Sequence, residues 1–146
     1  ESSRLREEGY RAALEAAGVV PDPDLVRGGD YRREGAHVPA RELLTLAERP
    51  TAIFAANDLS AIGTMDVARE LGISVPDELS VIGFDNVPES ALTGPPLTTI
   101  AQPMREMGAA ALSLLVGLLD GTREPGSHVR LPTELVARSS TARPRA

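Results

Sequence analysis

Three short apolar runs of this chain each end in Asp or Asn, and they constrain the fold more than any other feature. The runs cover residues 25–30, 52–58 and 80–86. A parallel strand that is buried on both faces has this continuous apolar character. In an open α/β sheet, ligands bind just beyond the carboxyl ends of such strands. The polar residues at these ends are therefore candidates for a binding site.

Helical and strand-like patterns alternate along the first hundred residues. We expect strands at 25–27, 51–56 and 79–84, and helices at 3–17, 39–48 and 59–71. Gly18 and Gly72 follow two of these helices, as is common at helix C-termini. In the second helix, Leu43, Leu44 and Ala47 are expected to point inward. This order predicts an α/β fold, a three-layer αβα arrangement with a parallel sheet and right-handed crossovers.

The last third of the chain has a different pattern. A strand is expected at 98–101, and Pro103 suits the first residue of a long helix that runs to about Asp120. Two further strands, at 128–131 and 134–138, precede a polar tail that we expect to fray. One face of the long helix is an apolar stripe, typical of a core or an interface, made of Met107, Ala111, Leu114, Leu115 and Leu118.

Composition narrows the class of protein. The chain has 146 residues, which suits one ordinary domain, and its 42% hydrophobic and 25% charged residues are typical of a globular protein. A formal net charge of −6 provides no basic surface for nucleic acid, and the absence of Cys excludes disulfides and thiol chemistry. No apolar run approaches the roughly 20 residues that span a bilayer. The start at Glu1, without Met, indicates a fragment of a longer protein.

The candidate site residues suit a hydroxylated ligand. Asp85, Asn57 and Arg6 supply carboxylate, amide and guanidinium groups, which match neighbouring hydroxyls that both donate and accept. Tyr31 could place its ring against the apolar face of a sugar or base. Each has a plainer alternative: Asp58 could cap the helix after it, Tyr31 could be a packed loop residue, and Arg6 a solvated helix residue.

Catalysis and metal binding have little support in the sequence. No G-x-S-x-G, G-x-x-x-x-G-K-[ST] or G-x-G-x-x-G motif occurs. A metal-dependent hydrolase using Asp58 and Asp85 is an alternative, but the chain contains no Lys to act as a cationic partner. His37 and His128 are far apart without metal-ligand spacing, so both are expected at the surface. We therefore predict a protein that is not an enzyme and holds no metal or cofactor.

Several motifs, in the same order over nearly the whole chain, carry a resemblance to a known family. They are PTAIFAANDLSAIG at 50–63, LGISVPDELSVIGFDN at 71–86, PPLTTIAQP at 95–103 followed by Met107-Gly108, and LPTELVARSST at 131–141. Together they resemble the effector-binding domain of LacI/GalR-family transcriptional regulators. The resemblance implies a two-lobed fold like the type I periplasmic binding proteins, with the effector held between the lobes.

The resemblance also implies an organisation for this chain. Residues 1–103 would form most of the C-terminal lobe, residues 104–132 would belong to the N-terminal lobe, and residues 133–146 would return to the C-terminal lobe. The helix-turn-helix, through which such regulators contact DNA, is absent from this chain. Without its partner lobe, the helix at 103–120 would expose its stripe, and we expect it to pack on another copy, to swap between chains or to be poorly ordered.

The same resemblance assigns functional positions. Arg6, Tyr31, Asn57 and Asp85 fall where the family contacts its effector, and Phe84 and Gln102 are second choices near the cleft and the crossover. The helix at 59–71 and the loop at 88–93 fall at the family's dimer interface, with Ile62, Met65 and Thr93 as the expected contacts.

The function implied is effector binding and dimerisation in a cytoplasmic, ligand-controlled repressor. The small-molecule effector is expected to be a carbohydrate, with a nucleoside or purine as the other option. The protein would act as a homodimer, with DNA bound only through the helix-turn-helix and with no membrane partner. The alternative is a sugar-binding protein of an ABC-type transport system, which shares the fold.

Overall fold

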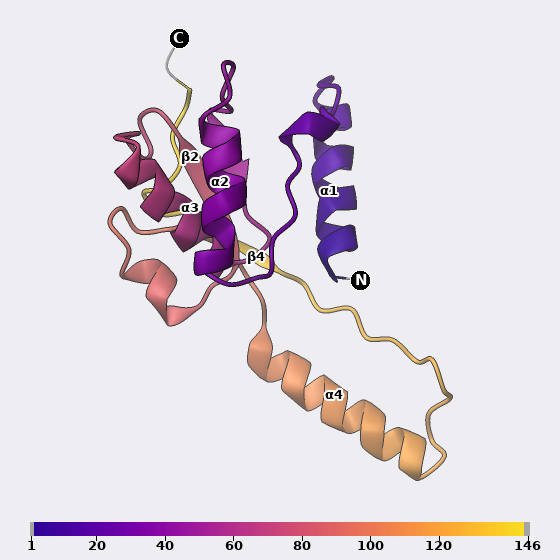
Figure 1. The fold of residues 1–146 in the computed structure, drawn as a ribbon. Coiled ribbons are helices and arrows are strands. Elements are labelled where there is room, and N and C mark those ends of the chain that lie inside the picture. The colour runs from indigo at the N-terminus through magenta and orange to yellow at the C-terminus, as the bar shows by residue number, and fades with distance from the viewer. Residues whose placement is uncertain (1, 145–146) are drawn as a thin grey trace.

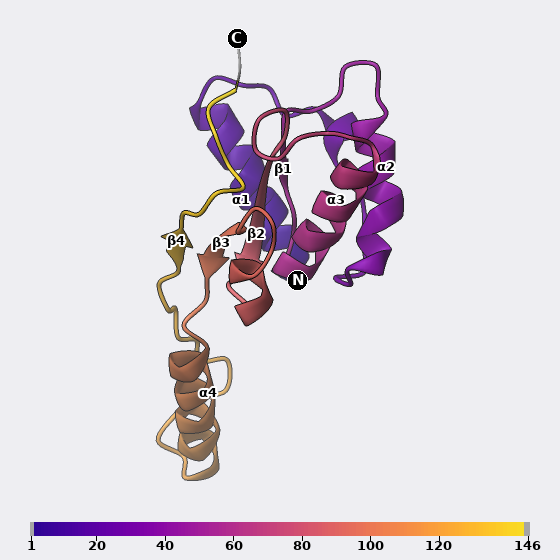
Figure 2. The same cartoon turned by 90° about the vertical axis from the view of Figure 1, so that its left-hand side faces the viewer.

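Three parallel strands and one antiparallel strand form the sheet of this protein. The computed structural model describes residues 2–144. The strand order is β1-β2-β3-β4, with β1, β2 and β3 parallel and β4 antiparallel to β3. Figure 1 shows the fold, and Figure 2 shows the four strands side by side. The α/β class and the parallel pairing that the sequence predicts are confirmed. In chain order the helices and strands are α1 (Ser2–Ala16), α2 (His37–Leu44), β1 (Ala52–Phe54), α3 (Asp58–Glu70), β2 (Ser80–Asp85), β3 (Thr98–Ala101), α4 (Met104–Leu119) and β4 (Glu134–Val136).

The core lies between the sheet and α3. Val67 of α3, Val81 of β2 and Leu97, which precedes β3, are all fully buried. Helix α3 packs against β2 and is covered in turn by α2, so nine of its 13 residues are buried. Gly63 allows the segment just before α2 to approach α3 closely, because a Cβ there would overlap the carbonyl oxygen of Arg33. We call α2, α3 and strands β1 to β3 the packed unit; Figure 2 shows α2 and α3 together beside the strands.

The prediction of a strand at 25–27 is wrong. The chain forms a short 3₁₀ helix there, Pro23–Leu25, and residues 26–30 pair with no strand of the described sheet. Asp22 caps this turn by accepting a hydrogen bond from the backbone N–H of Asp24, and Pro23 supplies no N–H to a ladder. The segment therefore runs between α1 and α2 without joining the sheet (Figure 1).

The second helix lies earlier in the chain than expected. It covers His37–Leu44 rather than 39–48, so Leu43 and Leu44 are buried as predicted but Ala47 is exposed. The Thr45 backbone N–H and its hydroxyl both bond to the carbonyl oxygen of Arg41, which closes the last turn. Pro39 is tolerated because N–H groups in the first turn have no helical partner.

Two expectations for the C-terminal part are also wrong. No strand forms at 128–131 within residues 2–144, and the second strand is limited to Glu134–Val136. The tail after Arg138 is not frayed where it is described. The Ser140 hydroxyl is fully buried, donates to the carbonyl oxygen of Val81 at 2.6 Å and accepts from the Thr98 N–H at 2.8 Å. Residues 145 and 146 lie outside the described part of the chain.

Helix α4 points away from the sheet in both views of the fold (Figures 1 and 2). Pro103 immediately precedes the helix, which therefore begins one residue later than expected. The helix is continuous over 16 residues, and its apolar stripe is largely exposed. What covers this stripe, a second copy or another part of the protein, stays a prediction. Among residues 2–144, no helix has both the length and the apolar character needed to cross a membrane.

Candidate functional site

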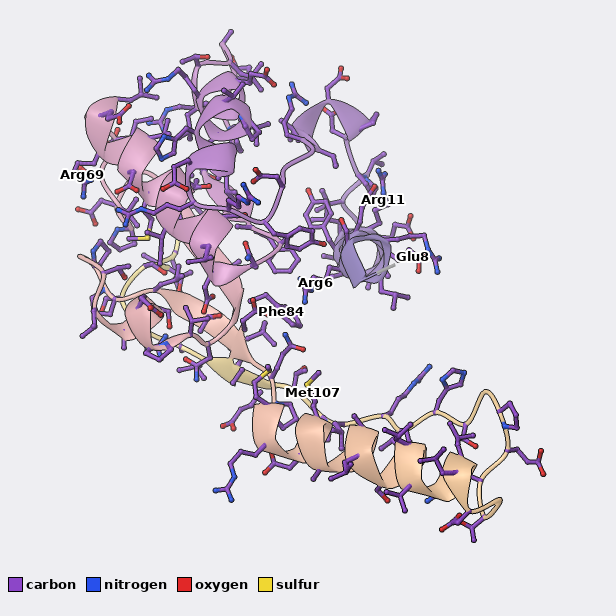
Figure 3. The ribbon with its side chains drawn as sticks, turned by 60° about the horizontal axis from the view of Figure 1, so that its bottom comes forward. Arg6, Glu8, Arg11, Arg69, Phe84 and Met107 are labelled. Atoms are coloured by element: carbon purple, nitrogen blue, oxygen red, sulfur yellow. The ribbon has the colours of Figure 1, made fainter. Side chains whose placement is uncertain are left out.

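Four of the six predicted ligand-binding residues meet at the carboxyl ends of β2 and β3. The Arg6 guanidinium, from the first turns of α1, lies 3.8 Å from an Asp85 carboxylate oxygen and 4.1 Å above the centre of the Phe84 ring. Gln102, just after β3, donates to the same Asp85 oxygen at 2.5 Å. Figure 3 shows Arg6 and Phe84 close together between α1 and the sheet. The structure thus places a cation, a carboxylate, an amide and a ring on one edge.

Arg6 is fixed by the strand end rather than free in solvent. Its guanidinium donates to the carbonyl oxygen of Ala56 at 2.6 Å, and its side chain is 17% exposed. Cation–π contact with Phe84 adds a second constraint on the same group. The plainer alternative, a solvated helix residue, does not describe this position. Guanidinium N–H groups that are not used by Ala56 remain available to a ligand beside Asp85.

Asp85 sits at a strained point of the backbone. Its φ is 118° and that of Asn86 is 60°, so two consecutive residues other than glycine adopt positive φ. Such residues cost about 1–3 kcal/mol each and persist only where the surroundings hold them. The Val87 N–H, on the far side of the turn, donates to Asp58 Oδ2 at 2.8 Å. The turn projects the Asp85 carboxylate, which keeps 28% of its surface exposed.

Asn57 and Tyr31 form a second pair. Asn57 is the N-cap of α3: its Oδ1 accepts from the Ser60 N–H at 3.0 Å, while its Nδ2 donates to the carbonyl oxygen of Tyr31 at 2.9 Å. Tyr31 has a φ of 67° and is 37% exposed. The Asn57 amide therefore fixes the loop that carries the aromatic ring. Direct contact of either residue with a ligand stays a prediction.

Asp58 is part of the interior. It is fully buried, and its carboxylate accepts from the Thr99 hydroxyl at 2.5 Å and from the Val87 N–H. Burial raises the pKa of the Asp58 carboxyl, and the bonds from Thr99 and Val87 oppose that rise. Asn57, not Asp58, caps the helix, which resolves the alternative left open by the sequence. No group of acidic and His residues within residues 2–144 has the geometry to hold a metal ion.

The predicted dimer residues line a separate hollow between α3 and the segment at 89–95. Ile62, Met65 and Thr93 border a cavity of about 590 Å³. Beside them the Asp66 carboxylate accepts two bonds from Arg33, at 2.6 and 3.0 Å, and one from Arg69 at 2.7 Å. The bond from Arg33 is the main cause that lowers the pKa of Asp66. This ion cluster has no motif in the sequence, because its members are brought together by packing.

Both histidines are expected at the surface, and one of them is fully at the surface while the other is partly buried. His128 is exposed. His37 is half-buried, and its Nε2 lies 3.9 Å from Asp66 Oδ2, too far for a hydrogen bond. Neither lies in the group around Arg6 and Asp85.

One residue of the site region could not be identified from the sequence. Arg138 donates to Asn86 Oδ1 at 2.7 Å, although 52 positions separate the two residues in the chain. Its only sequence signal is its place in the motif at 131–141, which contains β4. A smaller cavity of about 230 Å³, between α1 and β1, is lined by Arg6 and Phe54 but by none of the other predicted ligand residues.

Comparisons with known proteins agree on one family. Residues 1–141 match the periplasmic binding protein-like domain. The chain is 43% identical over 142 residues to the HTH-type transcriptional regulator DegA of Bacillus subtilis (strain 168), covering 97% of this chain and 41% of that protein. It is 38% identical over 136 residues to the HTH-type transcriptional repressor CytR of Escherichia coli (strain K12), covering 93% and 40%. The chain thus spans less than half the length of these relatives.

Solved structures give the same answer for the fold. The transcriptional regulator CelR in complex with cellobiose superimposes with a TM-score of 0.88 at 36% identity, over 92% of this chain and 41% of that one. A dimeric Lac repressor superimposes with a TM-score of 0.87 at 33% identity, over 99% and 52%. The chain therefore belongs to the periplasmic binding protein-like domain family, in the form found in LacI-type transcriptional regulators.

Proposed function

We propose that this chain is the effector-binding part of a ligand-controlled transcriptional repressor. The observation that carries the proposal is the group formed by Arg6, Asp85 and Gln102 beside the Phe84 ring, at the carboxyl ends of the strands. Converging charged and amide groups with one ring are suited to a small hydroxylated molecule. This role is non-enzymatic and requires no metal or cofactor.

A carbohydrate is the proposed effector class. The matched CelR structure is a complex with cellobiose, and a LacI family regulator from Arthrobacter sp. FB24, 34% identical to this chain, is a complex with lactose. A hydroxyl of such a ligand could accept from Arg6 while it donates to Asp85. Tyr31 and Asn57 would complete the site from the neighbouring loop. A nucleoside or purine is the second effector class.

The proposed mechanism is a population shift between two orientations of two lobes. Residues 1–103 and 133–146 would form one lobe, and residues 104–132, which include α4, would belong to the other. An effector that contacts both lobes favours one orientation by the difference in its affinity for the two. The exposed stripe of α4 supports this division, since an apolar helix face of this size is stabilised by burial.

The hollow around Ile62, Met65 and Thr93 is the proposed homodimer surface. The exposed Leu92, 84% accessible, lies on the same hollow, and the matched Lac repressor structure is dimeric. In a cytoplasmic regulator of this kind, DNA would be bound by a helix-turn-helix that is not part of residues 1–146. A sugar-binding transport protein is less well supported, because the relatives compared are regulators and repressors.

A thermal-shift screen of the full-length protein against sugars, polyols and nucleosides tests the proposal. A ligand that binds only the folded state raises its stability by RT ln(1 + [L]/Kd). Asp85→Ala should weaken binding by about 1.5–3 kcal/mol, the worth of a hydrogen bond to a charged group. The matched control is Asp24→Ala, at an exposed Asp of the short 3₁₀ helix after α1. Equal affinity of the wild type and Asp85→Ala for the effector would contradict this site.

A further inference from the structure

The turn after β2 needs an explanation that the site geometry alone does not supply. Asp85 and Asn86 adopt positive φ values of 118° and 60°, and neither is glycine. Residues held in such conformations are stabilised by neighbouring groups that exclude the alternatives. The direction of the Asp85 carboxylate depends on this backbone, because it is the last residue of the strand.

Arg138 reaches this turn from the other end of the chain. Its guanidinium donates to the carbonyl oxygen of Leu97 at 2.6 Å, to Ser90 Oγ at 3.0 Å and to Asn86 Oδ1 at 2.7 Å. Its backbone N–H also donates to the Thr98 hydroxyl at 3.0 Å. The contacts with Leu97, Ser90 and Thr98 fix Arg138 on the sheet, and the remaining arm of the planar fork holds Asn86.

The partners of Arg138 are unusual for a half-buried cation. All three acceptors are neutral, and none of the ion pairs formed within residues 2–144 includes Arg138. An ion-pairing role therefore does not account for its position. A rigid, planar donor that reaches three acceptors at once does account for it.

The opposite side of the turn is held separately. Asp58 Oδ2 accepts from the Val87 N–H, and Gln102 Nε2 donates to Asp85 Oδ1. Gln102 precedes α4 in the chain and Arg138 follows it. Gln102, between β3 and α4, and Arg138, just after β4, thus both contact the turn that carries Asp85.

We propose that Arg138 is a positioning residue for the effector site. By holding Asn86 in its left-handed conformation, it fixes the direction in which Asp85 presents its carboxylate. This inference rests on the proposed function only in taking Asp85 as an effector contact. It also means that a displacement of the segment after β4 would be transmitted to Asp85 through one side chain.

Hydrogen–deuterium exchange of the full-length protein tests the positioning directly. In Arg138→Met, the amides of Asn86 and Val87 should exchange about tenfold or more faster, the factor expected when one strained residue loses its support. The amides in the middle of α3 should be unchanged. In Arg138→Lys, which keeps the charge but loses the planar fork, the exchange rates of Asn86 and Val87 should lie between those of the wild type and Arg138→Met. Arg130→Met, at an exposed Arg of the segment after α4, is the matched control.

Asn86→Gly separates positioning from a general structural role. Glycine adopts positive φ without a Cβ penalty, so the turn should no longer depend on Arg138. Adding Arg138→Met to Asn86→Gly should leave the exchange of the turn unchanged. If Arg138→Met accelerates exchange equally in both backgrounds, or throughout β2 and β3, Arg138 merely stabilises the sheet and the proposal is overturned.

Binding of cellobiose and lactose gives the second readout. For whichever sugar the wild type binds, Arg138→Met should weaken affinity by about tenfold, and by much less in the Asn86→Gly background. A wild type that binds neither sugar argues against the proposed effector class, while the exchange experiment still decides the role of Arg138. Unchanged affinity in Arg138→Met, with a sugar that Asp85→Ala no longer binds, would overturn the positioning role alone.

Discussion

Helices α3 and α4 are both continuous helices but differ in their surroundings. α3 has 13 residues and α4 has 16, and α4 is the more apolar of the two, with five Leu and three Ala. Ala61 and Val67 of α3 are fully buried, whereas Leu112 and Leu119 of α4 are 62% and 79% exposed. A helix can thus be specified locally while its burial is decided by what lies beside it.

The ends of the two helices differ in the same way. α3 begins at an Asn57 side-chain cap, and Asp58 in its first turn is bonded to Thr99 and Val87 of the sheet side. α4 begins after Pro103 with no side-chain cap. The packed unit therefore holds α3 by side-chain bonds as well as by apolar contact, and α4 has neither along most of its length.

The largest expected effect is the loss of stability when a Leu is replaced by Ala in the core, compared with the same replacement on α4. Leu97→Ala, in the fully buried core, should lower the free energy of unfolding by about 2–5 kcal/mol through lost burial and a cavity. Leu119→Ala on α4 should change it by less than about 0.5 kcal/mol. Urea unfolding of both variants of this chain measures the difference. Equal losses would mean that another surface covers α4.

The ion cluster of Asp66 with Arg33 and Arg69 should make the stability of the packed unit depend on pH. Because Arg33 lowers the pKa of Asp66 in the folded state, Asp66 contributes stability above its unfolded pKa of about 4. That contribution is lost as pH falls through the lower folded pKa. Asp66→Asn should cost about 1.5–3 kcal/mol at pH 7 and flatten the acid side of the stability profile. An unchanged profile between pH 7 and 3 in urea unfolding would contradict this role.

The cap of α3 should have a smaller effect. Asn57→Ala removes the bond to the Ser60 N–H and should cost about 1 kcal/mol, within the range for N-caps. It also removes the hydrogen bond from Asn57 Nδ2 to the carbonyl oxygen of Tyr31, so the loop that carries the ring should become more mobile. Thermal unfolding and exchange of residues 30–33 measure the two effects. Asn57→Asp keeps the cap oxygen but not the Nδ2 donor. It should keep the stability that the cap provides and lose only the restraint on the Tyr31 loop.

The smallest effect is expected on α1, at the periphery. Glu8 pairs with Arg4 one turn earlier, and both side chains are more than half exposed. Glu8→Ala should change stability by less than about 0.5 kcal/mol, as for other exposed pairs. Glu8→Gln, which removes only the charge, should change stability even less at high salt, because salt screens the attraction between Glu8 and Arg4. A loss above 1 kcal/mol would place α1 among the packed elements.

Much of the fold follows from local patterns. The apolar runs at 51–56 and 79–84 contain β1 and most of β2, and the helix at 59–71 matches α3 within one residue at each end. The run at 25–27 has the same apolar character but does not pair, because Pro23 and the Asp22 cap favour a 3₁₀ turn. Apolar character alone does not decide which hydrogen bonds the backbone makes.

The sequence by itself determined the α/β class, the parallel order of the strands, the family, and which strand ends carry polar groups. Only the tertiary structure decided that Arg6 stacks on Phe84, that Asn57 rather than Asp58 is the cap, and that Arg138 holds the turn of Asp85. The periodicity of apolar residues along a segment indicates whether it forms a helix or a strand. A hydrogen bond between distant positions leaves no such pattern, because its geometry exists only after the sheet has brought both ends of the chain together.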